Sequence, residues 1–329
     1  MLEHSKKPRI LIVGIEDLVL TAVSEFHSLG YDILIFIPRE NKAMAQRLGL
    51  DQLGHEVFLF DDLESQNAHE KAQEFQPETI LCVIFETRIP QSFCDIASMC
   101  ALNFHPAALP ECRSGNAWFW PIRSGATQGA ISIHHMEYKW DAGAVVVKHP
   151  FPLGPFDTQG IYTERVYRQA RQSLQALHTR LLSGEFDGEP QPKSSYYPKI
   201  ALRDLAIDWN TPAKEIDALV RACNPFHYAE AVFRGQVIQI IQVSITPMKR
   251  SELTDASGQA IAPGQLVIRN HQLFCAAQHT ALRLDIVGVR DKITTTGDRF
   301  AHLFQVRPGE ALTSILVHPR YQTHLDTLL

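Results

Sequence analysis

Apolar runs alternate with amphipathic stretches through the first hundred residues. The runs RILIVGI, YDILIFI, EVFLF and TILCVIF are rich in β-branched and aromatic residues. The stretches between them, such as DLVLTAVSEFHSLG, carry apolar positions at helical spacing. Strands that are apolar throughout and alternate with helices are typical of a parallel sheet with helices on both faces. The pattern predicts a doubly wound, Rossmann-like α/β domain.

The pattern changes beyond Ala101. Two strands, AISIHHM and AGAVVVKHPF, flank a turn at Asp141, and a long helix is expected over the stretch DTQGIYTERVYRQARQSLQALHTRLLSG. Asp157 or Thr158 is a suitable N-cap for this helix, and Gly184 is a suitable stop.

The chain beyond this helix predicts a linker and a second domain. Residues 186–205 contain three prolines, two adjacent serines and one glycine, and we interpret them as a linker. One short helix, TPAKEIDALVRAC, then precedes strand-like pieces such as QVIQIIQVSI and ALRLDIVGV, which suggest a small β-barrel or sandwich. We therefore expect an α/β domain over residues 1–185, this linker, and a β domain over residues 206–329.

Composition excludes little but gives no sign of a membrane or nucleic-acid protein. The net charge is -5, with 45% hydrophobic and 20% charged residues. This balance provides no general attraction to phosphates or anionic lipids. The apolar runs are far shorter than the roughly 20 residues that cross a bilayer. The N-terminus shows no secretory signal, so we expect a cytoplasmic protein without a membrane partner.

Signatures of a bound nucleotide or metal are weak. Only Gly14 follows the first strand, without the G-x-G-x-x-G of dinucleotide-binding proteins. The six cysteines form no C-x-x-C pair, which favours reduced, structural thiols. His134 and His135 are adjacent in a strand and point to opposite faces, which disfavours a shared metal.

The segment LNFHPAALPECRSGNAWFW, which begins at Leu102, carries the candidate chemistry. Asn103 and His105 lie two residues apart where an apolar strand ends, so both can face one pocket at the usual binding edge of such a sheet. An amide can stabilise an oxyanion, an imidazole can carry a proton, and Asp141 can supply the acid. No nucleophile is evident, so the substrate would bring its own, for example an amine. A turn asparagine and a core histidine are the structural alternatives.

The region from Leu102 to Val146 resembles the signature of the formyltetrahydrofolate-dependent formyltransferases, which include methionyl-tRNA formyltransferases and nucleotide-sugar N-formyltransferases. The shared features are an Asn-x-His pair, a Leu-Pro step, an Arg turn, a Trp-containing helix and an Asp-x-Gly loop. They fall here on Asn103 and His105, Leu109-Pro110, Arg113, Trp120, and Asp141 with Gly143. FETRIP at Phe85–Pro90 is similar to the family's folate loop, and the segment from Tyr196 to Gly235 is similar to the start of its oligonucleotide-binding-like (OB-like) barrel.

The resemblance implies transfer of a formyl group from N10-formyltetrahydrofolate to an amine, without a metal. Asn103 would hold the formyl oxygen, His105 would bind the oxyanion or manage the proton, and Asp141 would orient His105 and help to deprotonate the amine. It places the folate donor against Phe85, Arg88, Ile89, Pro90, Met136, Tyr138, Trp140 and Gly143. It places the acceptor against Arg113, Ser114, Trp118 and Trp120.

The loop after the second strand bears on the identity of the acceptor. The family's tRNA enzymes carry a basic, Gly-rich loop after the second strand, whereas this chain has the shorter IFIPRENKAMAQRLGLDQLGHEV. We therefore expect a small-molecule amine, foremost a nucleotide-linked amino sugar, with methionyl-tRNA second and water, in a formyltetrahydrofolate hydrolase, as a further alternative. Ser114 and Ala117 replace the family's usual Gly and Pro, which bears on acceptor choice. A homodimer also stays open. A non-catalytic binding module on the same fold would be favoured only if Asn103, His105 or Asp141 were missing, and all three are present.

Overall fold

The computed structural model describes residues 7–113, 115–192, 196–254 and 258–327. The described chain forms two compact units. One comprises the chain up to Ala117 with Gln128–Pro152 and Thr163–Tyr197. The other comprises Trp118–Thr127, Leu153–Tyr162 and the chain from Pro198 onward.

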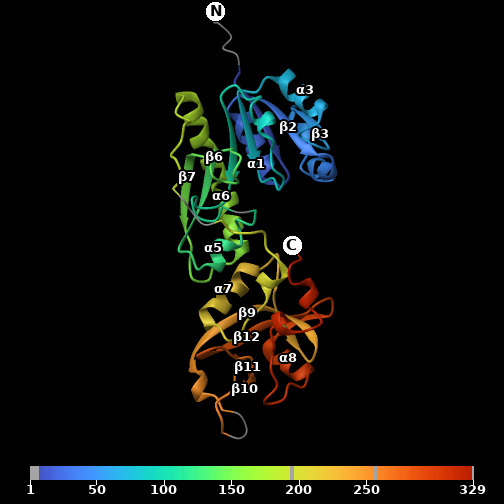
Figure 1. Ribbon diagram of the computed structural model, residues 1–329, viewed down its shortest axis with the longest axis vertical. Helices are drawn as coiled ribbons and strands as arrows, with labels where there is room; N and C mark the ends of the chain where they lie inside the picture. Colours follow the sequence, from blue (N-terminus) through green and yellow to red (C-terminus); the bar gives the residue numbers. More distant parts are fainter. Residues whose placement is uncertain (1–6, 114, 193–195, 255–257, 328–329) are drawn as a thin grey trace, which may run out of the picture. The chain divides into compact units, whose positions relative to one another are not determined.

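The first unit is built on a seven-stranded sheet (Figure 1). Its strands are β1 (Arg9–Gly14), β2 (Asp32–Pro38), β3 (Glu56–Phe60), β4 (Thr79–Val83), β5 (Cys100–His105), β6 (Gln128–His135) and β7 (Val145–Pro152), in the order β3-β2-β1-β4-β5-β6-β7. The first five run parallel, whereas β6 and β7 are antiparallel to their neighbours. The predicted parallel sheet is confirmed, with two antiparallel strands added at one edge.

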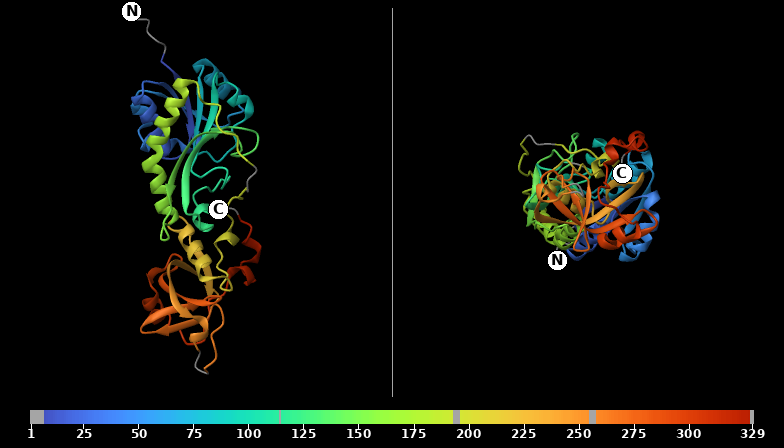
Figure 2. Two further views of the ribbon diagram at one scale, coloured as in Figure 1. Left: turned by 90° about the vertical axis from the view of Figure 1, so that its left-hand side faces the viewer. Right: turned by 90° about the horizontal axis from the view of Figure 1, so that it is seen from below.

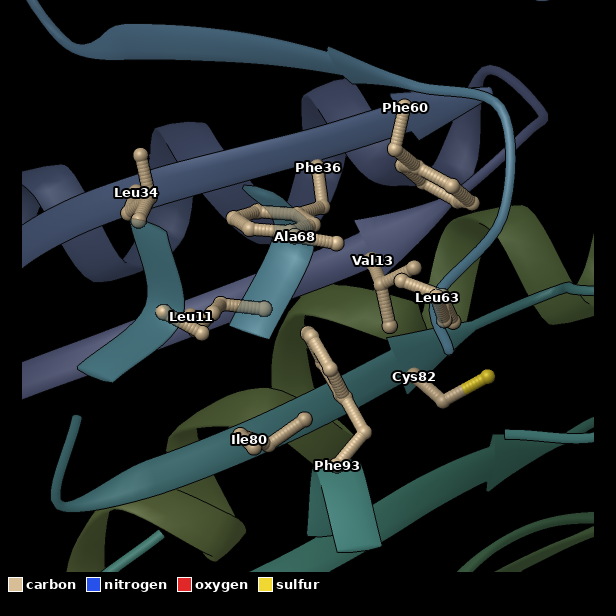
Figure 3. Packing of buried hydrophobic residues seen from close by; sticks show 11 residues of the cluster. Leu11, Val13, Leu34, Phe36, Phe60, Leu63, Ala68, Ile80, Cys82 and Phe93 are labelled. Carbon is tan, nitrogen blue, oxygen red and sulfur yellow. The ribbon is translucent and has the colours of Figure 1, made fainter. Parts of the chain in front are cut away.

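One helical layer explains why the parallel strands are apolar throughout. Alternate residues of β1, β2 and β4 pack on α3 (Gln66–Phe75) and α4 (Gln91–Cys94), as Figure 3 shows. The buried members of this cluster are Leu11, Val13, Leu34, Phe36, Phe60, Leu63, Ala68, Ala72, Ile80, Cys82 and Phe93. The intervening residues, such as Ile10 and Ile12, are equally buried on the opposite face. Burial on both faces is what a continuous apolar strand requires.

The opposite face carries α1 (Leu18–Ser28) and most of α6 (Gln159–Ser183), which runs alongside the sheet in Figure 2. The two helices are joined through the buried Glu25, which lies 2.7 Å from Arg171 and accepts from Gln175 at 2.9 Å. The hydroxyl of Thr158 accepts from the backbone N–H of Ile161 at 3.3 Å, as the predicted N-cap should. The helix ends before Gly184, which has a φ of 73°.

Two short helices lie one in each unit. Helix α2 (Lys42–Arg47) follows β2 in the first unit, and α5 (Trp120–Arg123) belongs to the second. The second unit also contains α7 (Ala213–Cys223), α8 (Gly297–Leu303) and an antiparallel sheet of β8 (Ala229–Phe233), β9 (Gln236–Lys249), β10 (Leu266–Arg269), β11 (Gln272–Ala276), β12 (Thr280–Val289) and β13 (Ile293–Thr296). The predicted short helix followed by a strand-rich region is therefore present.

All six cysteines are buried free thiols. Burial raises the pKa of the Cys94, Cys100 and Cys112 thiols to about 11, so none of these is a thiolate near neutral pH. Within the described residues, no helix is both long enough and apolar enough to cross a membrane.

Candidate active site

Asn103 and His105 lie at the carboxyl end of β5, beside the antiparallel strand β6. The register places Asn103 opposite His134 and His105 opposite Ser132. His105 is 4% exposed and Asn103 is half-buried. The strand end therefore presents both predicted polar groups at the edge of the sheet where ligands usually bind.

Asp141 reaches the same place from the loop between β6 and β7. Its carboxylate Oδ1 lies 3.4 Å from Asn103 Nδ2 and 3.8 Å from His105 Nδ1. The residue is 8% exposed and holds a φ of 51°, in the left-handed region that a residue with a side chain rarely adopts. The structure thus brings together the three residues singled out in the sequence, although they span almost forty positions.

His134 is a fourth polar member of this cluster that the sequence did not indicate. Its Nδ1 donates to the carbonyl of His135 at 2.7 Å, so the neutral ring has a bare Nε2. That nitrogen accepts from Asn103 Nδ2 at 3.1 Å and lies 3.4 Å from Asp141 Oδ1. The sequence alone gives His134 no role, since His134 and His135 point to opposite faces of a strand and this disfavours a shared metal. Among the described residues, no group of three His, Cys, Asp or Glu side chains is arranged to hold a metal ion.

His105 is arranged to accept a proton toward Asp141. Its Nε2 donates to the carbonyl of Cys112 at 3.1 Å, which leaves Nδ1 bare in the neutral ring and facing the carboxylate. Burial lowers the pKa of His105, while the charge of Asp141 opposes that shift. His105 is therefore neutral near pH 7, and a proton taken up at Nδ1 would be stabilised by Asp141.

A cavity of about 50 Å³ opens onto Asn103, His134 and Asp141. Its remaining walls come mainly from residues predicted to hold the folate donor: Phe85, Arg88, Ile89, Met136 and Trp140, together with Cys82, Thr87 and Glu137. The Arg88 guanidinium lies 4.5 Å from the centre of the Tyr138 ring and 5.8 Å from that of Trp140. The loop after β4 and the loop after β6 thus meet over the cavity.

Gly143 and Pro90, also predicted to contact the donor, do not line this cavity. Gly143 packs against backbone, because a Cβ built on it would lie 2.1 Å from the carbonyl oxygen of His135. Pro90 precedes α4 as its N-cap residue. Gly143 therefore allows the Asp141 loop to approach β6 closely.

A larger cavity of about 410 Å³ lies where β2 and β3 end. It shares Phe85, Thr87 and Arg88 with the smaller cavity and is also lined by Pro38, Arg39, Glu40, Phe60, Asp61, Asp62 and Leu63. Its size falls within the roughly 300–1,000 Å³ of small-molecule sites.

The residues predicted to contact the acceptor are less concentrated. Arg113 belongs to the first unit, where its guanidinium donates to Gln191 Oε1 at 2.8 and 3.0 Å and to the carbonyl of Pro192 at 3.2 Å. Trp118 and Trp120 belong to the second unit, where the Trp120 indole donates to the carbonyl of Pro198 at 3.1 Å. Ser114 lies outside the described residues.

Two family models match the chain. The model described as Formyl transferase matches residues 23–177, and that of the Formyl transferase C-terminal domain matches residues 199–305. The chain belongs to the formyltransferase family. Enzymes of this family take their formyl group from N10-formyltetrahydrofolate, which is therefore the donor of this N-formyltransferase.

Individual relatives differ in their acceptors. The methionyl-tRNA formyltransferase of Levilactobacillus brevis is 26% identical over 84% of this chain and 89% of its own length. The N-formyltransferase of Helicobacter canadensis, solved with folinic acid and dTDP-3-aminofucose, has a TM-score of 0.64 at 13% identity and covers 84% of this chain and 99% of its own.

HypX from Aquifex aeolicus has a TM-score of 0.59 at 19% identity and covers 93% of this chain. This chain spans only 49% of HypX. At these identities, the similarity to HypX and to the Helicobacter canadensis enzyme shows a shared fold only.

Proposed function

We propose that this formyltransferase acts on the primary amine of a small molecule, foremost a nucleotide-linked amino sugar, through Asn103, His105 and Asp141. The observation that carries the proposal is that Asn103 and His105 lie 3.4 and 3.8 Å from one carboxylate oxygen of Asp141. Asn103 and Asp141 also line a cavity whose other walls include predicted donor residues. An amide, a neutral imidazole and a carboxylate, with no nucleophile among them, suit an acceptor that brings its own.

The lining of the smaller cavity fits a flat heteroaromatic ring. Phe85, Ile89, Met136 and Trp140 supply apolar and aromatic walls, and Asn103, His134 and Asp141 are among the polar groups that line it. A volume of about 50 Å³ is below that of typical small-molecule sites, so we infer that the exposed Arg88, which lines the cavity, moves to admit the ring. Arg88 and Tyr138 are exposed, and their rearrangement disturbs no buried contact.

The donor supplies a formyl group activated for attack by an amine, and the protein's residues manage the charge and the proton. The contact of Asn103 Nδ2 with Asp141, at 3.4 Å, is the longer of the two that this amide makes, so this N–H is the one to turn toward the formyl oxygen. Asp141 then accepts a proton from the attacking amine, directly or through Nδ1 of His105. That proton passes on to the departing N10.

The charges around α2 favour a small acceptor over tRNA. Arg39 lies 2.8 Å from Asp61, and Arg47 lies 2.6 Å from Asp17. Two of the three Arg and Lys residues in the segment between β2 and β3 thus already face carboxylates, with Lys42 as the third, whereas phosphate binding needs clustered, available cations. The cavity of about 410 Å³ beside them is of small-molecule size.

Methionyl-tRNA is the second candidate, because several relatives in sequence are methionyl-tRNA formyltransferases. A formyltetrahydrofolate hydrolase is the third, since water can occupy the position of the amine. We also infer that the sheet of the second unit closes as an OB-like barrel. In support, the backbone of Leu312 and Thr313 bonds to Gly264 on one side and to Val232 on the other. A homodimer stays a prediction.

The test is an acceptor screen. The protein is mixed with N10-formyltetrahydrofolate, and release of tetrahydrofolate is followed by absorbance with dTDP- and UDP-linked amino sugars, with charged initiator tRNA, or with water alone. Release that depends on a sugar nucleotide is the expected result. Release only with methionyl-tRNA would overturn the small-molecule proposal, and release without any amine would identify a hydrolase.

A further inference from the structure

The segment after α6 returns to the loop that carries Asp141. The backbone of Glu189 exchanges two hydrogen bonds with Val145, at 2.8 and 2.9 Å, and so extends the edge of the sheet beside β7. His135 Nε2 donates to the carbonyl of Phe186 at 2.6 Å. The part of the expected linker over residues 186–192 is thus fixed to the strands on either side of the Asp141 loop.

Gln191 makes the most extensive of these contacts. Its Nε2 donates to the carbonyl of Asp141 at 2.9 Å and to the carbonyl of Gly143 at 2.6 Å. Its Oε1 accepts from Nε and Nη2 of Arg113 at 3.0 and 2.8 Å. Carbonyls only accept and a guanidinium only donates, so the orientation of this amide is determined, and its two N–H groups and its oxygen all have partners.

These bonds act on a strained residue. The φ of 51° at Asp141 lies in the left-handed region, which residues with a side chain seldom adopt unless the surroundings support it. Gln191 holds the carbonyl of Asp141 itself and the carbonyl two residues further on. Without those two donors the loop can relax, and the Asp141 carboxylate then leaves its place beside His105.

We propose that Gln191 is a positioning residue for formyl transfer, which holds the backbone of Asp141 so that its carboxylate faces His105 and Asn103. This inference rests on the proposed role of Asp141. Gln191 also ties Arg113, in the predicted acceptor segment, to the same loop. One side chain therefore hydrogen-bonds both to the backbone of the Asp141 loop and to Arg113.

Three variants test the proposal. Gln191→Met keeps the shape of the side chain and removes all of its hydrogen bonds. Gln191→Glu keeps an acceptor for Arg113 and loses both donors to the Asp141 loop. Gln175→Met is the matched control, because it removes a glutamine hydrogen bond, to Glu25, elsewhere in the same unit.

The acceptor identified by the screen is used to measure kcat and the KM for the donor. Gln191→Met and Gln191→Glu should each lower kcat by about 10-fold or more, with the donor KM within about twofold of its original value, as expected when a general base is displaced. Gln175→Met should leave both constants unchanged. A Gln191→Glu enzyme with normal kcat would overturn the proposal, because the bond to Arg113 alone would then suffice.

A crystal structure of Gln191→Met separates this inference from the proposed function. The separation of Asp141 Oδ1 and His105 Nδ1, 3.8 Å in the unaltered protein, should widen, and φ of Asp141 should return to negative values. An unchanged Asp141 would overturn the positioning role whether or not an acceptor is found. Absence of turnover by the unaltered enzyme with every acceptor would count against the proposed function alone.

Discussion

At the scale of single residues, Asp141 is a carboxylate held in a buried site by polar partners. Two imidazole rings and one amide surround its Oδ1 at 3.4–3.8 Å. Each of these contacts is longer than a strong charge-assisted hydrogen bond of about 2.7–2.9 Å. These three groups lie close enough to respond to the charge of the Asp141 carboxylate.

The lowered pKa of His105 predicts the direction of a pH dependence. Because burial keeps the folded ring neutral, the unfolded chain takes up a proton first, at its ordinary pKa of about 6.5. The contribution of this residue to the free energy of unfolding is thus complete above that pH and is lost as the pH falls below it. Urea unfolding of the unaltered protein and of His105→Gln between pH 5 and 8 measures the difference. A stability advantage of the unaltered protein that grows toward low pH would contradict this reading.

Gly143 is predicted to tolerate no side chain. A Cβ there would meet the His135 carbonyl oxygen at 2.1 Å, and a backbone atom of a strand cannot move aside. Gly143→Ala should therefore displace the Asp141 loop, lower the free energy of unfolding by about 1–3 kcal/mol and lower kcat.

Gly154→Ala is the control for this substitution, because its nearest contact would be an ordinary 3.6 Å. Thermal melting and tetrahydrofolate release compare the two variants. If Gly143→Ala and Gly154→Ala lowered the melting temperature and the turnover equally, the close packing of Gly143 against His135 would not explain the loss.

At the scale of elements, the alternation of side chains along a single strand could be predicted from the sequence. The alignment of one strand against its neighbour could not. Asn103 and His105 could be assigned to one face because residues two apart in a strand point the same way. His134 could not be assigned, because its place opposite Asn103 follows from the antiparallel pairing of β5 and β6. No local pattern gives that pairing. It becomes visible only when the two strands are aligned.

Gln191 shows the same limit. The composition of residues 186–205 is that of a connecting segment. It gives no sign that the backbone of Glu189 pairs with that of Val145. Side chains in such a segment acquire a role only through the partners that the fold brings to them.

The packing of α4 on the sheet can be tested directly. Phe93 is fully buried, with its ring centre 5.5 Å from that of Phe36 (Figure 3). Phe93→Ala should lower the free energy of unfolding of the first unit by about 3–5 kcal/mol, because the cavity that it leaves lies between a helix and a sheet.

The neighbouring, exposed Ser92→Ala should change that free energy by less than about 0.5 kcal/mol. Denaturant unfolding followed by circular dichroism compares the two variants. A small loss for Phe93→Ala would mean that α4 is not part of the cooperative core.

At the scale of the whole molecule, the chain is a formyltransferase of two units whose acceptor is the open question. The fold and the donor are common to relatives with different acceptors. Their difference must therefore lie in surface charge and in the shape of the acceptor site. A net charge of -5 and the paired arginines near α2 both point away from a polyanion.

Salt dependence distinguishes the acceptors. Binding that uses six to ten phosphate contacts weakens by about 10³- to 10⁵-fold between about 50 and 200 mM salt. A nucleotide-linked sugar carries two phosphates, so its KM should rise by less than about tenfold over this range. A steep increase in the acceptor KM, measured with the best acceptor from the screen, would indicate a nucleic acid.

The measurement that tests the central claim most directly is the turnover of Asp141→Asn with N10-formyltetrahydrofolate and the acceptor found by the screen. The amide keeps the size of the side chain but removes its charge and its ability to accept a proton. We predict that kcat falls by about 10²- to 10⁴-fold while the melting temperature changes little. Turnover close to that of the unaltered enzyme would show that the cluster of Asn103, His105 and Asp141 does not carry out the transfer.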